Sequence, residues 1–229
     1  MSKMIFMEKR FERPFNLSIE DSKNYGSGVG CNYFLLVKTD TLRRTSFERE
    51  KYFESYAAYF LVSSRTGKLI LWTLSKFEED SPGRSQQKLT ASIENSVHEL
   101  SEKIRSSEKE NIIYGRESDD FKLENNFTGS EDFRPPMPYR RVKPQYTRTA
   151  SLYDILATVD AAVDIDDAGN VKNIEILRWA GFGLDESVVK TILGLKWRPA
   201  DLKGKPLAMR ILLRYNFKNI ETDSETDTK

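Results

Sequence analysis

The sequence predicts an α+β protein with two small α/β domains joined by a proline-rich linker. Three patterns predict this fold class. Residues alternate from Leu207 to Phe217, which is typical of a strand with one buried face. The face predicted to be buried holds Leu207, Met209, Ile211, Leu213, Tyr215 and Phe217, and the wetter face holds Arg210, Leu212, Arg214 and Asn216. Two shorter alternating runs flank a turn at 166–170. Apolar residues recur at helical spacing between Leu89 and Ile104, which predicts an amphipathic helix.

Changes in composition divide the chain into five segments. They are an irregular N-terminal segment (1–30), an α/β domain (31–107), a linker (108–143), a second domain (144–218) and a disordered tail (219–229). The linker is first acidic and then rich in proline and basic residues, a composition that favours extended and stiff backbone.

The first domain is predicted to hold three strands and a helix. The run 32–39 is a short apolar strand, and 56–77 holds two strands joined by a hairpin turn at Arg65–Lys68, where Gly67 supplies a permissive backbone. The helix follows over 85–107. Its apolar stripe is formed by Leu89, Ile93, Val97, Leu100 and Ile104.

The second domain is predicted to run strand, strand, helix, strand. Its first hairpin turns at the Asp-Asp-Ala-Gly-Asn sequence 166–170. A short helix follows, with Asp185 as a plausible N-cap and Gly194 as its stop. Pro206 then heads the long final strand.

The overall composition excludes several classes of protein. The 36 basic and 35 acidic residues nearly cancel, so no net charge favours nucleic acid or an anionic membrane. No run approaches the roughly 20 apolar residues that span a bilayer. The first residues also lack the apolar core of a signal peptide. Cys31 is the only cysteine, which rules out an internal disulfide.

Signals for catalysis, cofactors or metals are weak, so we expect a protein that is not an enzyme. The only histidine, His98, lies beside the helical stripe and is expected on the surface. The glycines at 26, 28 and 30 lack the strand and helix of a dinucleotide site. The acidic residues Asp164, Asp166 and Asp167 lack the spacing of a calcium loop and sit where aspartates stabilise turns.

The final strand is the feature that suggests a binding function. A last strand is often an edge strand, whose unpaired N–H and C=O groups can accept another chain. The alternative is a strand in the middle of the sheet or one that pairs in a homodimer. Arg210 and Arg214 on its open face are either gatekeepers against aggregation or partners for acidic groups of an added peptide.

Residues 144–218 resemble the C-terminal domain of TonB-family energy transducers. The Pro-Gln-Tyr-Thr sequence at 144–147 resembles the family's Pro-x-Tyr-Pro entry, and 154–177 resembles its first hairpin. The stretch 184–217 resembles its Leu-Asp helix, its Trp-Arg-x-Pro-Ala turn, its Gly-Lys-Pro loop and its closing strand. Thr147 replaces the second proline of the entry motif, and Asp154 and Ala157 replace two usual glycines.

The resemblance implies a fold and a partner. It implies a three-stranded antiparallel sheet with helices on one face, whose closing edge strand receives a short TonB-box strand of an outer-membrane receptor. The entry motif would pack beside that strand, and Trp197 would anchor the core. The implied partner-binding residues are Gln145, Tyr146, Arg210, Ile211, Leu212, Leu213, Arg214 and Tyr215. The resemblance also implies a periplasmic location, although the family's membrane anchor is not visible in this sequence.

A second, weaker resemblance covers residues 31–107. Their succession of a strand, a strand ending in an Arg-Thr-Gly turn, a strand with Trp72 and a long helix is similar to the α/β domain of periplasmic lipoproteins of the curli-secretion and penicillin-binding-protein-activator type. Cys31 falls inside this pattern and is interpreted as a small core residue.

Two functions are therefore weighed. The first is an envelope protein that binds an outer-membrane receptor or another envelope partner by β-strand addition, in TonB-dependent transport or a related adaptor role. The alternative is a structural periplasmic module that dimerises through its C-terminal strand without energised transport. An enzyme is a distant third, because the chain offers one histidine and scattered carboxylates.

Overall fold

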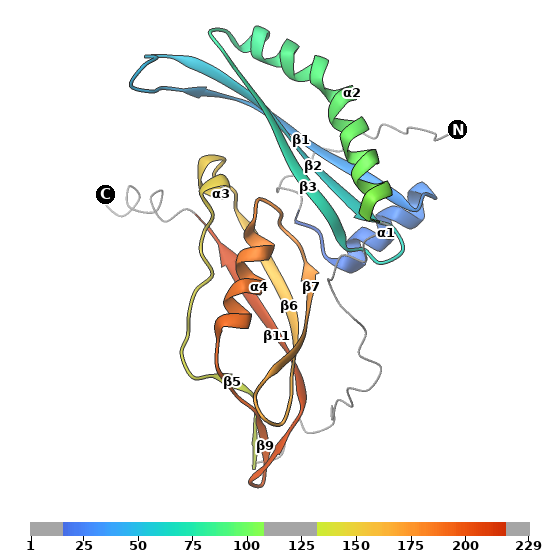
Figure 1. Cartoon of the computed structure of the whole chain (residues 1–229), viewed down its shortest axis with the longest axis vertical. Coiled ribbons are helices and arrows are strands. Elements are labelled where there is room, and N and C mark those ends of the chain that lie inside the picture. Colours follow the sequence, from blue (N-terminus) through green and yellow to red (C-terminus); the bar gives the residue numbers. More distant parts are fainter. Residues whose placement is uncertain (1–15, 108–131, 219–229) are drawn as a thin grey trace, which may run out of the picture. The chain divides into compact units, whose positions relative to one another are not determined.

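A computed structural model describes residues 16–107 and 132–218 of the chain (Figure 1). These residues divide into two compact units. Within the described ranges, the first unit covers 20–107, and the second covers 16–19 together with 132–218. The acidic part of the predicted linker and the predicted tail lie outside the described residues.

The first unit is a three-stranded antiparallel sheet with a long helix. Its sheet order is β1 (Tyr33–Arg44), β2 (Tyr52–Ser63) and β3 (Leu69–Glu79), and helix α2 (Pro82–Ser107) follows. The hairpin turn between β2 and β3 lies where the sequence predicts it. The first strand is longer than the predicted 32–39, because it pairs with β2 over its whole length.

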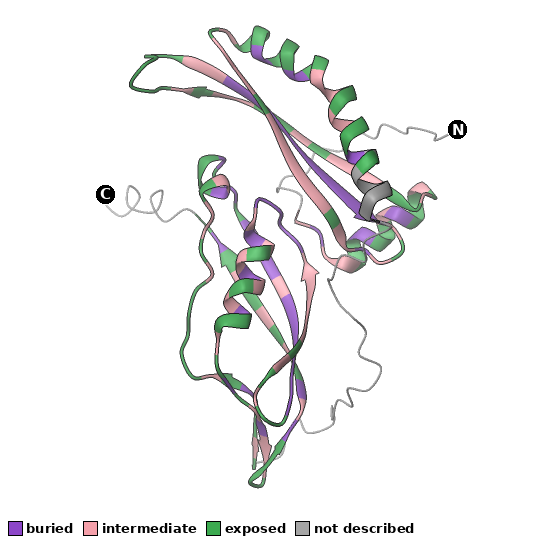
Figure 2. Cartoon of the chain, viewed as in Figure 1, coloured by how far each residue is buried: buried purple, intermediate pink, exposed green. Residues whose placement is uncertain are grey.

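The core of this unit lies between the sheet and α2. Ala57 and Tyr59 of the central strand form a buried cluster with Leu89 and Leu100 of the helix. Figure 2 shows β2 as almost entirely buried. His98 is exposed, as its place outside the apolar stripe predicts.

The prediction of an irregular segment over 1–30 is wrong for its last part, because Ile19–Val29 forms the helix α1. The sequence did not predict this helix because the segment contains glycines, and glycine disfavours helical backbone. Gly26 is needed there, because a Cβ atom would collide with Ser64. Gly30 follows the helix in the left-handed conformation (φ +69°), and its N–H donates to the carbonyl oxygen of Gly26 (3.0 Å).

The second unit contains the predicted strand, strand, helix, strand succession. Its main sheet is antiparallel with the order β11 (Met209–Phe217), β6 (Ala157–Ile165) and β7 (Val171–Arg178). Helix α4 (Leu184–Gly194) packs against β6 and β7. The fold-class prediction is confirmed: the protein is α+β, and this unit has a three-stranded antiparallel sheet with a helix on one face (Figure 1).

The second unit begins earlier than the predicted boundary at 144. Strand β4 (Phe133–Arg134) pairs with β9 (Ala200–Leu202), and β5 (Met137–Pro138) pairs with β8 (Trp197–Arg198). The last part of the predicted linker is therefore folded onto the domain. Extended, proline-rich backbone is suited to such short edge pairings, which explains why its composition resembles that of a free spacer.

The final strand is interrupted at its start. Pro206 belongs to β10 (Lys205–Leu207), which pairs with β9, and β11 begins only at Met209. Trp197 is buried, as expected of a core anchor, and its indole N–H donates to the carbonyl oxygen of Ile192 (3.4 Å).

Two of the three departures from the TonB family pattern bear on the local backbone structure. Thr147 is the N-cap of α3 (Arg148–Leu152): its Oγ1 accepts the Ala150 N–H (3.1 Å) and donates to the carbonyl oxygen of Phe182 (2.6 Å). A proline could make neither bond. Asp154 has a positive φ of 47°, a conformation that glycine adopts at lower cost.

The prediction that Asp185 caps α4 is wrong. The N-cap is Gly183, in the left-handed conformation (φ 77°). Asp185 lies inside the first turn, and its carboxylate instead accepts the backbone N–H groups of Ala180 (2.9 Å) and Gly181 (2.7 Å). Burial raises the pKa of Asp185 to about 7, although these two donors act in the opposite direction.

Candidate partner-binding edge

The final strand lies at an edge of its sheet. In the described part of the chain β11 pairs with β6 alone, from Met209 opposite Ile165 to Phe217 opposite Ala157. Its other side therefore presents a row of backbone N–H and C=O groups without a neighbouring strand. The structure thus excludes, for the described residues, the alternative in which this strand lies in the middle of the sheet.

The helix side of β11 is only partly covered. Met209 and Phe217, near the two ends of the strand, are buried, whereas Ile211, Leu213 and Tyr215 between them are partly exposed. Burial raises the pKa of the Tyr215 hydroxyl above its ordinary value. A row of half-covered apolar side chains beside an open strand edge is a surface that an added strand would bury.

The opposite face of β11 is tied to β6 by two bidentate ion pairs. Arg210 donates to both carboxylate oxygens of Asp164 (2.6 and 2.8 Å). Arg214 donates in the same way to Asp160 (2.7 and 3.0 Å). Both arginines are therefore paired within the sheet. Of the two sequence hypotheses, this geometry favours gatekeeping over pairing with a partner's acidic groups.

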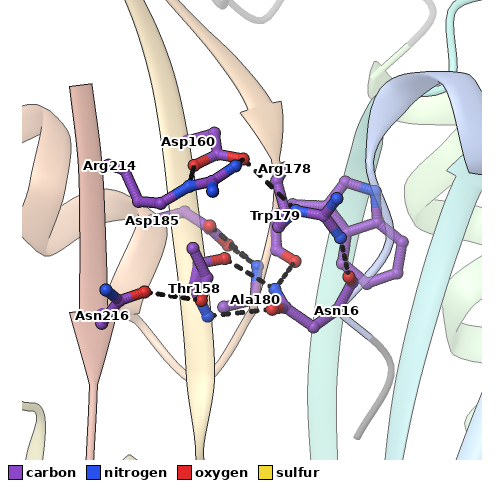
Figure 3. Close-up of polar contacts among 9 residues, drawn as sticks. All are labelled: Asn16, Thr158, Asp160, Arg178, Trp179, Ala180, Asp185, Arg214 and Asn216. Carbon is purple, nitrogen blue, oxygen red and sulfur yellow. Dashed lines mark hydrogen bonds and ion pairs between the residues drawn. The ribbon is translucent and has the colours of Figure 1, made fainter. Parts of the chain in front are cut away.

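The charges on this face act together. Asp160 also accepts a hydrogen bond from Nε of Arg178 on β7 (3.3 Å), so one carboxylate links all three strands (Figure 3). The Arg214 guanidinium, with that of Arg178, holds the pKa of Asp160 below its ordinary value against the effect of burial. Asp164 similarly raises the pKa of Arg210.

Leu212 is the exception on this face. It lies between the two arginines and is 73% exposed. Its neighbour across the ladder, Ala162, is buried. An exposed leucine at the centre of an edge strand is an apolar contact point that nothing within the described residues covers.

The entry motif packs beside the end of β11, as the resemblance implies. The Tyr146 ring stacks on Phe217 with a centroid distance of 6.4 Å. Its hydroxyl group lies within hydrogen-bonding distance of two carbonyl oxygens, those of Ala150 (3.1 Å) and Ile155 (3.0 Å). The ring of Tyr146 thus packs against the last residue of β11. Its hydroxyl group is already hydrogen-bonded within the domain.

Gln145, the residue before Tyr146, has an exposed side chain. Its backbone carbonyl oxygen accepts a hydrogen bond from Oγ of Ser187 on α4 (2.8 Å), which fixes the main chain. The structure therefore brings Tyr146 to one end of β11 and leaves the side chain of Gln145 in solvent. The six predicted residues Arg210, Ile211, Leu212, Leu213, Arg214 and Tyr215 all lie on the edge strand itself.

Two of the three aspartates considered as metal ligands have other contacts. Asp164 pairs with Arg210, while Asp166 holds the hairpin turn by accepting the backbone N–H groups of Ala168 (3.0 Å) and Asn170 (2.7 Å). Burial would raise the pKa of Asp166, but bonds from Asn170 and Lys172 outweigh it and lower the pKa to about 2. This aspartate stabilises the turn, in line with the interpretation of the sequence.

Sequence reasoning missed four residues that contact this sheet or its strands: Asn16, Asp160, Arg178 and Phe217. The alternation could have predicted the role of Asp160 and Asp164, because it places both on one face of β6. There they lie across from Arg214 and Arg210 of the neighbouring strand. Phe217 had been assigned to the buried face but not to the support of the strand. Asn16 carries no signal, since its partners are 142 and 163 residues away.

Comparisons with known proteins place the second domain near one family. Residues 142–219 match the family model of the Gram-negative bacterial TonB protein C-terminal, so this part of the chain is a TonB-family C-terminal domain. The solution NMR structure of the Pseudomonas aeruginosa TonB CTD is similar at 22% identity, covers 41% of this chain and 92% of that chain, and has a TM-score of 0.33. No curated protein matches the chain.

The family match supports a TonB-like role in the cell envelope. Within the described ranges, none of the helices combines the length and apolarity that crossing a membrane requires. The resemblance of 31–107 to periplasmic lipoproteins stays a prediction.

Proposed function

We propose that this chain is an envelope protein whose TonB-like domain binds an outer-membrane receptor, or another envelope protein, by adding a strand of the partner to β11. The observation that carries the proposal is the open edge of β11, which pairs only with β6 among the described residues. The TonB family of residues 142–219 supports the kind of partner. The role is binding, in the periplasm, and no catalytic step is assigned.

The added strand would gain affinity and selectivity from different groups. Its backbone would hydrogen-bond to the free side of β11, which gives affinity with little dependence on sequence. Alternate side chains would then cover Ile211, Leu213 and Tyr215 on the helix side and Leu212 on the other. The partner segment is therefore expected to be extended, with apolar residues at alternate positions.

Charge plays a small part in this proposal. Arg210 and Arg214 already have bidentate carboxylate partners within the sheet. An acidic partner would have to compete with those pairs, and exposed ion pairs contribute little. Affinity for a TonB-box peptide should consequently change little between low and physiological salt.

The test uses paired proline substitutions in the full chain. Neighbouring residues of a strand direct their N–H groups to opposite sides, so Ile211→Pro and Leu212→Pro differ in which side loses a donor. The variant whose lost N–H pointed to β6 loses a bond within the sheet and unfolds at a lower temperature. The variant whose lost N–H pointed to the free side of β11 keeps its melting temperature, since edge strands tolerate proline there.

The stable proline variant is expected to bind a TonB-box peptide at least about tenfold more weakly in calorimetry. Leu212→Ala and Leu193→Ala form a matched control pair, because both leucines are exposed and only the first lies on β11. The proposal predicts weaker binding for Leu212→Ala alone. Unchanged peptide affinity in the stable proline variant would rule out strand addition at this edge.

The alternative occupant of the same edge is a second copy of the chain. The exposure of Leu212 on an open strand is the observation that favours this structural role. Sedimentation velocity separates the two functions. A monomer that binds receptor peptides supports the receptor-binding role, and a stable dimer without peptide affinity supports the dimerising module.

A further inference from the structure

The other edge of the same sheet is formed by β7, and its end at Arg178 is covered by a segment from the far end of the chain. Residues 16–18 lie against the end of β7, where Ser18 forms an antiparallel bridge with Arg178. The Trp179 N–H donates to the carbonyl oxygen of Leu17 (3.2 Å). The Leu17 side chain is buried. The segment therefore makes the contacts of a short added strand.

Asn16 makes the most specific contacts of this segment. Its side-chain Nδ2 donates to the backbone carbonyl oxygens of Thr158 (2.8 Å) and Trp179 (2.7 Å). Its Oδ1 accepts the backbone N–H of Thr158 (2.8 Å). Figure 3 shows this side chain between Thr158 on β6 and Trp179 beyond the end of β7.

The register of the sheet explains why a carboxamide is needed there. The last paired residues of β6 and β7 at this end are Asp160 and Arg178, and the next rung would involve Thr158. Because β7 has ended, the N–H and C=O of Thr158 on this side need another donor and acceptor. The asparagine side chain supplies both in the geometry of a peptide group.

The site discriminates between side chains of similar size. Two donors face two carbonyl oxygens, and one acceptor faces an N–H group. An aspartate would place a carboxylate oxygen against those carbonyls, and an alanine would leave all three backbone groups without this partner. Arg178 adds a further contact, since its Nη1 donates to the backbone carbonyl oxygen of Asn16 (2.7 Å).

We propose that the β7 edge is a second peptide-binding site, selective for an asparagine in an extended segment, and that its resident ligand is the chain's own Asn16-Leu17-Ser18. The site works in cis and covers the end of this edge at Arg178. This proposal depends on the contacts of Asn16 and is independent of what binds β11.

The test is amide hydrogen exchange in the full chain. Asn16→Ala and Asn16→Asp are both expected to speed exchange of the Thr158 and Trp179 amides by roughly 10- to 100-fold, the scale of losing one or two backbone hydrogen bonds. The matched control is Asn216→Ala, which removes the other asparagine bonded to Thr158, through its hydroxyl group. That variant should leave the Trp179 amide unchanged.

Two results would overturn the proposal. Wild-type exchange at Trp179 in Asn16→Ala would mean that the segment is not held at this edge. Wild-type exchange in Asn16→Asp would mean that the site does not select a carboxamide. Sedimentation velocity tests the cis arrangement: a monomer supports it, and a dimer that dissociates on Asn16→Ala would show the segment exchanged between two copies and overturn it.

Discussion

Arg214 on the edge strand donates two hydrogen bonds to Asp160 on the central strand, at 2.7 and 3.0 Å. Because Asp160 also accepts a bond from Arg178, this carboxylate connects the edge proposed for the partner with the residue of β7 that holds Asn16. The open face of the sheet is thus neutralised by its own residues.

Because Asp160 is shared by two arginines, substitutions of Asp160 and of Arg214 should differ in their effect on stability. Asp160→Asn is expected to lower the melting temperature more than Arg214→Ala, because it removes the partner of two arginines, while Arg214 is largely exposed. Equal shifts for the two variants in thermal unfolding would contradict a shared role.

The same pair has a defined pH dependence. The folded pKa of Asp160 is lowered, so its stabilisation is present above the ordinary aspartate pKa and is lost as pH falls through the folded value. Part of the acid destabilisation of the wild-type protein should therefore be absent in Asp160→Asn. Urea unfolding at a series of acidic pH values measures this difference.

Asp185 should behave in the opposite way. Burial raises its folded pKa to about 7, so the folded state binds more protons than the unfolded state between about pH 4 and 7. Through this group, stability falls as pH rises across that window. Asp185→Asn should remove the decline, and a carboxyl group that is fully ionised by pH 5 in an NMR titration would contradict the assignment.

Gly169 and Gly204 form a matched pair for testing the hairpin contact. Both have a positive φ, +83° and +81°, and alanine costs about 1–2 kcal/mol in that conformation. A Cβ at Gly169 would also collide with the backbone oxygen of Trp197, whereas a Cβ at Gly204 would meet no described atom within 4 Å beyond its chain neighbours. Gly169→Ala should therefore cost about 1–3 kcal/mol more than Gly204→Ala in denaturant unfolding. Equal costs would mean that the turn does not touch Trp197.

The hydroxyl group of Tyr146 is expected to contribute to the stability of the domain and not to peptide affinity. Tyr146→Phe keeps the stack on Phe217 but removes the hydroxyl donor that lies between two carbonyl oxygens, at a cost of about 1 kcal/mol in unfolding free energy. Peptide affinity measured well below the melting temperature should not change. Lost affinity at full stability would instead assign the hydroxyl to the partner site.

Much of the second domain could be predicted from its sequence. Alternation from Leu207 to Phe217 assigned Ile211, Leu213 and Tyr215 to one face and Arg210, Leu212 and Arg214 to the other, and the structure has this arrangement. The turn at Asp166–Asn170 was also foreseen, since its aspartate and glycine favour that backbone locally. Such features depend on neighbours in the chain.

Other features depend on partners that are remote in sequence. The proline-rich stretch at 132–143 and the glycine-rich α1 were misjudged, because pairing with β8 and β9 and contact with Ser64 override local propensity. Composition cannot show such a contact.

The sequence by itself determined the fold class, the faces of the strands and the TonB-like succession of elements, because periodicity and turn chemistry are local. Only the tertiary structure decided that β11 is an edge, that Arg210 and Arg214 are neutralised by Asp164 and Asp160, and that Asn16 completes β6. Strand order and register bring together residues that are far apart in the chain, and hydrogen bonds and ion pairs form only where that register places donor and acceptor within reach.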